Sequence, residues 1–155
     1  MIASEQAKRV IKESLTKKDK LKLIRGMLLT RALDNALKHL FLSGEITYEG
    51  KGFHGKGFRS LGQEAIYGAT FFLKVGKSFY DNDRYVGDVA APLIRDMGVF
   101  LAMSGDDCLS VLNAQAGKEG LPSHGRDLHL GDPSKGLITP AAPLAIATCN
   151  ALGMA

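Results

Sequence analysis

Three short segments, residues 62–65, 87–99 and 125–131, combine glycines with side chains that could bind or act on a ligand. The first reads Gly-Gln-Glu-Ala and stands at an expected helix start, after a glycine-rich loop. Acidic side chains stabilise the amino-terminal end of a helix dipole, so this segment taken alone indicates helix capping more than chemistry. None of the three segments is decisive by itself, and the functional interpretation depends on their order and spacing.

The second and third segments contain the residues best suited to chemistry. Arg95 lies three residues before Gly98, and a guanidinium matches a phosphate in geometry and charge. The alternative for Arg95 is an ordinary surface ion pair with Asp88 or Asp96. His129 lies between glycines and close to a stretch of small apolar residues, which is typical of a loop folded over a ligand. A single loop histidine is nevertheless more often structural than catalytic.

The elements that must position these residues are predicted to be mostly helical. Residues 1–18 suggest a polar leader helix, and Thr16 with Asp19 predicts the start of a long helix that ends near residue 43. The apolar spacing predicts further helices at residues 63–73, 90–103 and 108–116, and a short strand at 137–139. Residues 141–155 are almost wholly apolar and predict the start of a buried helix, so we expect residues 19–155 to form a partial domain.

The composition is that of a soluble globular protein, with 45% hydrophobic and 23% charged residues in 155. The net charge is +4, and basic residues crowd the first 25 positions. Acidic residues are interleaved there and no aromatic stacking platform is nearby, which favours a solvated helix face over a nucleic-acid site. No apolar run reaches the ~18 residues that would cross a membrane, so we expect a cytoplasmic protein. Cys108 and Cys149 follow no ligand spacing and are expected to be free thiols.

Taken together, the motifs resemble the alpha subunit of the thiamine-diphosphate-dependent decarboxylating component of 2-oxo acid dehydrogenase complexes, of the pyruvate or branched-chain type. The resemblance covers about residues 20–155. The family's first helix carries an arginine and an acid, matched here by Arg31 and Asp34. Its later motifs are a G-Q-E-A box, a G-D and arginine segment, a glycine-basic loop that ends in histidine, and an S-S-P-L-A segment, matched by residues 62–65, 87–98, 125–129 and 142–145.

The resemblance implies an α/β fold, namely the N-terminal portion of a thiamine-diphosphate-binding fold that is mostly helical in the region present. It implies that Arg95 binds the diphosphate of the cofactor and that Ala142 and Leu144 line the aminopyrimidine. Ile94 would also contact the cofactor, where the family usually has Tyr or His. His129 would be the catalytic residue.

The resemblance also implies a substrate pocket and a metal site. Phe58, four residues before the Gly-Gln-Glu-Ala box, would line the pocket, and its bulk suits a branched or aliphatic 2-oxo acid. The family binds Mg²⁺ through a G-D-G motif, and no Gly-Asp pair of this chain is followed by glycine. We therefore expect the Mg²⁺ ligands beyond residue 155 and assign no metal ligand within the chain.

The implied activity is oxidative decarboxylation of a 2-oxo acid, with transfer of the acyl group to a lipoyl carrier. The implied partners are a beta subunit, in a heterotetramer, and a lipoyl-bearing acyltransferase, with neither nucleic acid nor membrane. The beta subunit would supply the acid that activates the aminopyrimidine, so the chain alone is expected to be inactive. The alternatives are an acetoin-cleaving or transketolase-like enzyme with the same cofactor, and a non-catalytic interaction module derived from the fold.

Overall fold

The protein is described by a computed structural model that covers residues 14–52 and 59–154. The described residues form mainly helices, together with two small two-stranded sheets. This composition is compatible with the predicted α/β, mostly helical fold class. Most of the predicted leader helix, and Phe58, lie outside the described residues. The elements are α2 (Lys17–Leu42), β1 (Thr47–Tyr48), β2 (Lys51–Gly52), η1 (Glu64–Thr70), η2 (Lys77–Phe79), β3 (Tyr80–Asp81), β4 (Arg84–Tyr85), α3 (Met97–Ser104), α4 (Cys108–Gln115), η3 (Pro133–Lys135) and α5 (Ile146–Met154).

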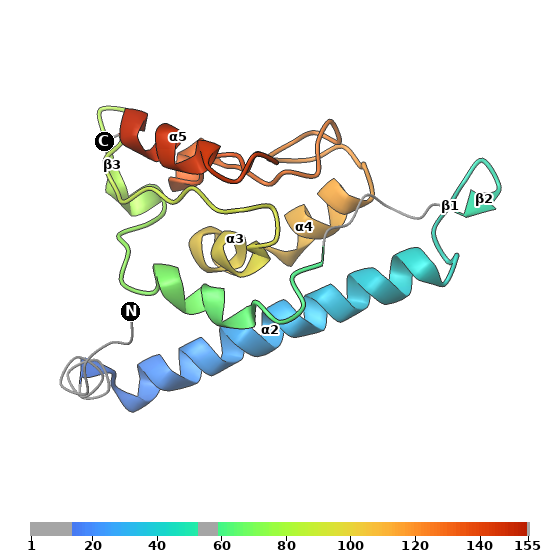
Figure 1. The fold of residues 1–155 in the computed structure, drawn as a ribbon, viewed down its shortest axis with the longest axis horizontal. Coiled ribbons are helices and arrows are strands. Elements are labelled where there is room, and N and C mark those ends of the chain that lie inside the picture. The colour runs from blue at the N-terminus through green and yellow to red at the C-terminus, as the bar shows by residue number, and fades with distance from the viewer. Residues whose placement is uncertain (1–13, 53–58, 155) are drawn as a thin grey trace.

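Helix α2 runs the length of the molecule along one side (Figure 1). It begins as the sequence predicts: the Thr16 hydroxyl accepts from the Asp19 main-chain N–H at 3.2 Å, and the Asp19 carboxylate accepts from the Thr16 N–H at 2.9 Å. This capping box satisfies donors that a helix start leaves without partners. Its buried residues recur every three or four positions, so one stripe of the helix faces the core.

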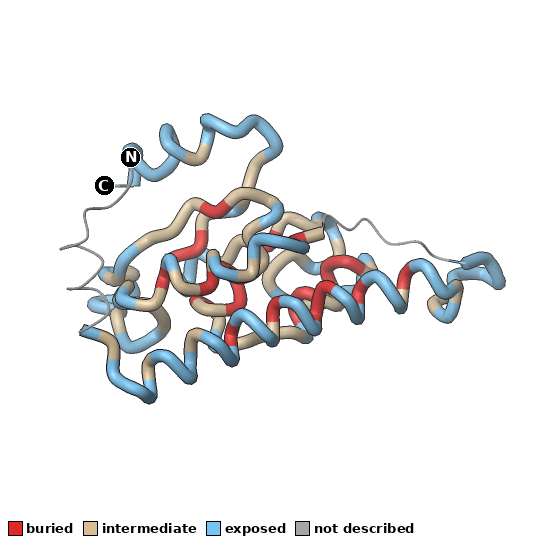
Figure 2. Tube along the Cα trace, turned by 60° about the horizontal axis from the view of Figure 1, so that its bottom comes forward, coloured by how far each residue is buried: buried red, intermediate tan, exposed pale blue. Residues whose placement is uncertain are grey.

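The core lies between α2 and the helices η1, α3 and α4 that pack against it, and in Figure 2 the buried stretches gather on that side of α2. Close approach depends on Gly26 of α2, since a β-carbon there would overlap the Tyr67 ring of η1. Tyr67 is 3% exposed, and its hydroxyl donates to Asp106 Oδ1 at 3.0 Å, just after α3. Arg25 of α2 pairs with the same carboxylate. Three elements are therefore joined at one tyrosine and one aspartate.

The helix predicted over residues 90–103 is wrong at its start, because α3 begins only at Met97. Pro92 lacks an N–H and disfavours helical geometry in the residue before it. Ala90 instead pairs with the chain around Leu137: its N–H donates to Gly136 O at 2.8 Å, and its carbonyl accepts from Ile138 N at 3.0 Å. Leu137 forms isolated bridges with Ala90 and with Asp132, and residues 137–139 do not form the short strand predicted there.

Two more predicted helices are present in altered form, and one is as predicted. The helix expected at residues 63–73 is a 3-10 helix, η1, and α4 matches the one expected at 108–116. Helix α5 exists, but the prediction that it is buried is wrong, since none of its residues is buried (Figure 2). Nothing in the described chain covers Leu152, which is 78% exposed. None of the helices among the described residues is both long and apolar enough to span a membrane.

Candidate functional site

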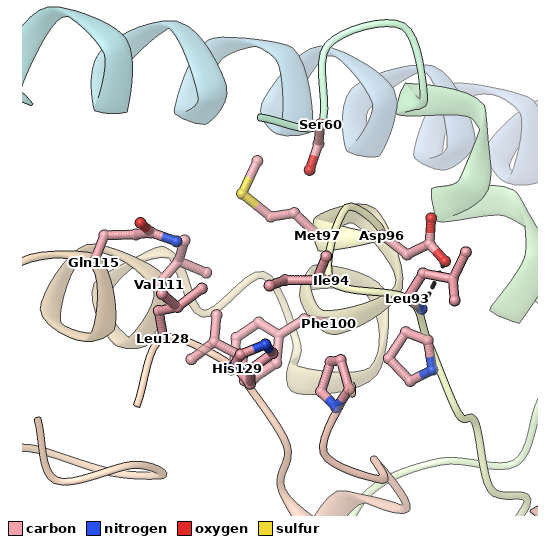
Figure 3. Close-up of a pocket in the computed structure, with 13 residues that line it drawn as sticks. Ser60, Leu93, Ile94, Asp96, Met97, Phe100, Val111, Gln115, Leu128 and His129 are labelled. Carbon is pink, nitrogen blue, oxygen red and sulfur yellow. Dashed lines mark hydrogen bonds between the residues drawn. The ribbon is translucent and has the colours of Figure 1, made fainter. Parts of the chain in front are cut away.

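Ile94 and His129, two of the residues singled out by the sequence, line the same pocket (Figure 3). They come from the turn before α3 and from the long loop after α4. The cavity measures about 30 Å³, which is room for about two water molecules. Its lining is mainly apolar and consists of Ser60, Pro92, Leu93, Ile94, Asp96, Met97, Phe100, Val111, Gln115, Leu128, His129, Leu130 and Pro140.

Three polar side chains besides His129 reach this pocket. Asp96 Oδ2 accepts from the Leu93 N–H at 2.9 Å, which fixes the turn before α3. Ser60 is 2% exposed and carries one wall of the pocket. Gln115 is 6% exposed, and its Oε1 has no hydrogen-bond partner among the described residues. In Figure 3 these groups come from different sides of the cavity, around Ile94 and Phe100.

His129 is oriented by a neighbouring carboxylate. Its Nδ1 lies 2.6 Å from Asp127 Oδ1, and its main-chain N–H donates to the same oxygen at 3.2 Å. Burial raises the pKa of Asp127, but the hydrogen bonds from the His129 ring and main chain outweigh it, and the net pKa is lowered. In a neutral ring with its proton on Nδ1, Nε2 is left as an acceptor. The arrangement is chemically that of an oriented general base.

Arg95 lies beside the pocket and does not line it. It is exposed, and it follows Ile94 in the turn that carries two lining residues. The surface ion pair considered from the sequence is not formed: Asp88 accepts from the Lys74 N–H at 2.9 Å and Asp96 from the Leu93 N–H. Within the described part of the chain, Arg95 therefore presents a guanidinium without a partner of its own.

Ala142 and Leu144 are not brought to Ile94 and His129. Both are exposed, Leu144 at 75%, and neither lines the pocket. Pro140 is the pocket residue of that segment. The chain leaves the core after Pro140 and turns outward into α5, which separates the predicted aminopyrimidine contacts from the other predicted site residues.

Arg31 and Asp34, which match the family's first helix, anchor the loop before η1 on α2. Arg31 Nε donates to Glu64 Oε1 at 2.5 Å; this hydrogen bond, with one from the Gly62 N–H, lowers the pKa of Glu64 to about 2. Asp34, 2% exposed, accepts from Arg59 Nε at 2.8 Å and from the Ser60 N–H at 2.7 Å. These two acids hold Ser60 in place as a pocket wall.

Sequence reasoning missed Gln115 and Ser60. The signal for Gln115 was present, because it stands one helical turn after Val111, a buried residue of the apolar stripe of α4. A buried polar side chain normally has a hydrogen-bond partner, so a polar residue on a buried helix stripe indicates a candidate binding residue. No sequence pattern indicated Ser60, because it lies in a loop where apolar residues follow no regular spacing.

No group of three or more His, Cys, Asp or Glu that could hold a metal ion occurs among the described residues. Cys108 and Cys149 are free thiols, and burial raises the pKa of Cys108. Comparisons of the chain with models of known protein families, with curated proteins and with solved structures found no match.

Proposed function

We propose that this chain is the alpha-subunit part of a thiamine-diphosphate-dependent 2-oxo acid dehydrogenase, of the pyruvate or branched-chain type. The order of its motifs supports this. The observation that carries the proposal is the exposed Arg95, which has no partner among the described residues and directly follows a residue of the pocket that His129 also lines. A guanidinium suits an anionic cofactor, and an imidazole held by a carboxylate suits an acid-base residue.

Among the described residues, Arg95 has the chemistry that the diphosphate end of the cofactor would need. Arg95 offers a forked donor, and a guanidinium matches phosphate oxygens in shape and charge. The cavity of about 30 Å³ is far smaller than the ~300–1,000 Å³ usual for a small-molecule pocket, so the rest of the cofactor would lie outside it. The proposed beta subunit would cover that part.

When bound, thiamine diphosphate supplies the ring that takes up the electrons released with CO₂. The chain's own residues bind, orient and move protons. Arg95 would hold the anionic end, the apolar side chain of Ile94 would exclude water, and His129, held by Asp127, would accept or return a proton at Nε2. Phe58 is proposed for the acyl pocket, and a lipoyl-bearing acyltransferase for the acceptor.

The test is cofactor affinity in the full enzyme with its beta partner. A charge-assisted hydrogen bond contributes ~1.5–3 kcal/mol, so Arg95→Ala should raise the dissociation constant of thiamine diphosphate by ~10- to 100-fold. Arg95→Lys should restore part of the affinity, because it keeps the charge without the fork. Arg84, exposed in β4, is the matched control, and Arg84→Ala should be nearly silent. Titration calorimetry that shows the reverse pattern would overturn the proposal.

A non-catalytic interaction module is the second candidate. It is favoured by the exposed apolar side chains on the outer face of α2, of which Leu21, Ile24 and Leu28 are 59%, 54% and 65% exposed. A non-catalytic module would bind a partner protein tightly and would show no measurable affinity for thiamine diphosphate in the full complex.

A further inference from the structure

We infer that the outer face of α2, formed by Leu21, Ile24 and Leu28, binds an acidic amphipathic helix of a partner protein. The lysines one helical turn before this face, Lys17 and Lys20, would meet the acidic side chains of that helix. The inference concerns the surface on which the second candidate function is based, and it does not depend on the cofactor proposal.

The first argument is the apolar stripe on the side of α2 that points away from the core. Leu21, Ile24 and Leu28 are each more than half exposed, and their helical spacing places them on one face. The buried stripe of the same helix, which includes Thr30 and Leu33, lies on its other side (Figure 2). A surface helix normally has a polar outer side, so a second apolar stripe indicates a surface that a partner covers.

The second argument is shape. An open groove of about 310 Å³ runs along this stripe where η1 begins beside α2, and it is lined by Ile24, Met27, Leu28, Arg31 and Glu64. Its lining is apolar apart from the Arg31–Glu64 ion pair. Such grooves receive the apolar side chains that a partner helix presents at positions i, i+3, i+4 and i+7. A bilayer surface has no such projections and would have to cover the ion pair, which favours a protein helix over a membrane.

The third argument is charge. Lys17 and Lys20 are exposed, and neither forms an ion pair with a described residue. Asp19, the acidic residue between them, is already bound to Thr16 in the capping box. The uncompensated charge next to the apolar stripe is therefore positive. A helix with carboxylates beside its own apolar stripe complements it, as oppositely charged flanks do in paired helices.

Charge also argues against a second copy of this chain as the occupant. Two outer faces placed together would bring lysines against lysines. The other exposed apolar segment, residues 141–155, contains no Asp or Glu, and residues 1–13 contain three basic against two acidic residues. Neither segment supplies the acidic flanks, so the helix comes from a different protein.

The experiment measures the binding of two labelled peptides to the full chain by fluorescence anisotropy. Each peptide has about 18 residues, or about five helical turns, with leucines along one face. One peptide carries glutamates at the flanking positions and the other carries lysines there. We expect the glutamate peptide to bind with a micromolar dissociation constant, ~10-fold or more tightly than the lysine peptide, and to weaken as NaCl is raised. Equal binding of the two peptides would overturn the inference.

Matched variants at exposed positions locate the site without disturbing the core. Leu28→Glu should weaken the glutamate peptide by ~10-fold or more, because it places a carboxylate in the groove. Leu152→Glu, in α5, introduces the same charge at another exposed leucine and should leave binding unchanged. If Leu152→Glu removes the peptide and Leu28→Glu does not, the inference fails.

A second pair of variants tests the lysines. Lys17→Glu with Lys20→Glu should weaken the glutamate peptide by ~10-fold or more. Lys51→Glu with Lys118→Glu alters the net charge equally at exposed lysines outside α2 and should have a much smaller effect. Equal effects of the two pairs would show that the peptide responds to net charge and not to this face.

Vesicles of phosphatidylserine and phosphatidylcholine test the membrane alternative. If the chain binds these vesicles through Leu28 and does not bind the glutamate peptide, the outer face is a membrane surface and the inference fails. The cofactor proposal is tested at Arg95 in the full enzyme, so either result here leaves that test intact. The second candidate function fails separately, if the full complex binds thiamine diphosphate.

Discussion

At the scale of single residues, Asp34 connects the long helix to the wall of the pocket. Its buried carboxylate accepts from the Arg59 guanidinium and the Ser60 N–H. Removing this buried acceptor leaves the Ser60 N–H without its partner, while Arg59, 36% exposed, can turn to solvent, so the expected loss is ~1–3 kcal/mol. Asp34→Ala should therefore lower the free energy of unfolding in urea by about that amount. Lys38→Ala, on the exposed face of α2, should change it by less than ~0.5 kcal/mol, and equal effects would contradict the role given to Asp34.

Glu64 makes stability depend on pH in the acid range. Its hydrogen bond from Arg31 lowers its pKa from 4.5 to about 2 in the folded chain. The folded state therefore holds fewer protons than the unfolded state between these values. The stabilisation is complete above pH 4.5 and is lost as the pH falls towards about 2.

The measurement for Glu64 is the difference in unfolding free energy between the natural chain and Glu64→Gln, at several pH values. The natural chain should be the more stable at pH 6, and the difference should shrink steadily below pH 4.5. A difference that stays constant across this range would show that the Arg31–Glu64 contact is not what stabilises the loop.

At the scale of elements, two glycines in helices should respond in opposite ways to the same substitution. Alanine usually stabilises a helix by ~1 kcal/mol relative to glycine. Gly153 in α5 has open space around it, so Gly153→Ala should follow this rule. Gly26→Ala would press a methyl group into the Tyr67 ring and should destabilise by ~1–3 kcal/mol. Thermal unfolding of both variants checks the pair, and stabilisation by Gly26→Ala would show that α2 and η1 can move apart.

The same elements show how much of the fold could be predicted. The start of α2 could be predicted because Thr16 and Asp19, three residues apart, form a capping box. The start of α3 was not, because the pairing of Ala90 with Gly136 and Ile138 joins segments distant in sequence. The shared pocket of Ile94 and His129 is likewise a product of tertiary packing. Ala142 and Leu144 lie outside this pocket because the chain turns away from the core after Pro140. The local sequence pattern does not predict that turn.

At the scale of the whole molecule, apolar side chains are exposed at several places, and two of these are considered for association. One is the outer face of α2, and the other is the segment with Leu144, Leu152 and Met154, which are 75%, 78% and 61% exposed. Contiguous exposed apolar surface drives association. We expect the isolated chain to self-associate, and static light scattering over a concentration series measures this.

Two double variants locate the associating face. Leu144→Glu with Leu152→Glu should lower the apparent mass more than Leu21→Glu with Leu28→Glu, because α5 has no buried residue to anchor it in the chain itself. A monodisperse monomer at high concentration would contradict self-association altogether. A larger effect of the α2 pair would assign the association to α2.

The tyrosine at the meeting point of α2, η1 and the end of α3 gives the molecule an optical signal of its own. The chain has no tryptophan and four tyrosines, so its near-ultraviolet absorbance comes mainly from phenol rings. Burial, and then the hydrogen bond to Asp106, raise the pKa of Tyr67 from 10.0 to about 12. In the unfolded chain Tyr67 loses its proton near pH 10. The stabilisation that protonated Tyr67 contributes to the folded state is therefore lost between pH 10 and about 12. In an alkaline titration, phenolate absorbance from Tyr67 should appear late and together with loss of the folded far-ultraviolet spectrum, reporting the opening of the core without any added label.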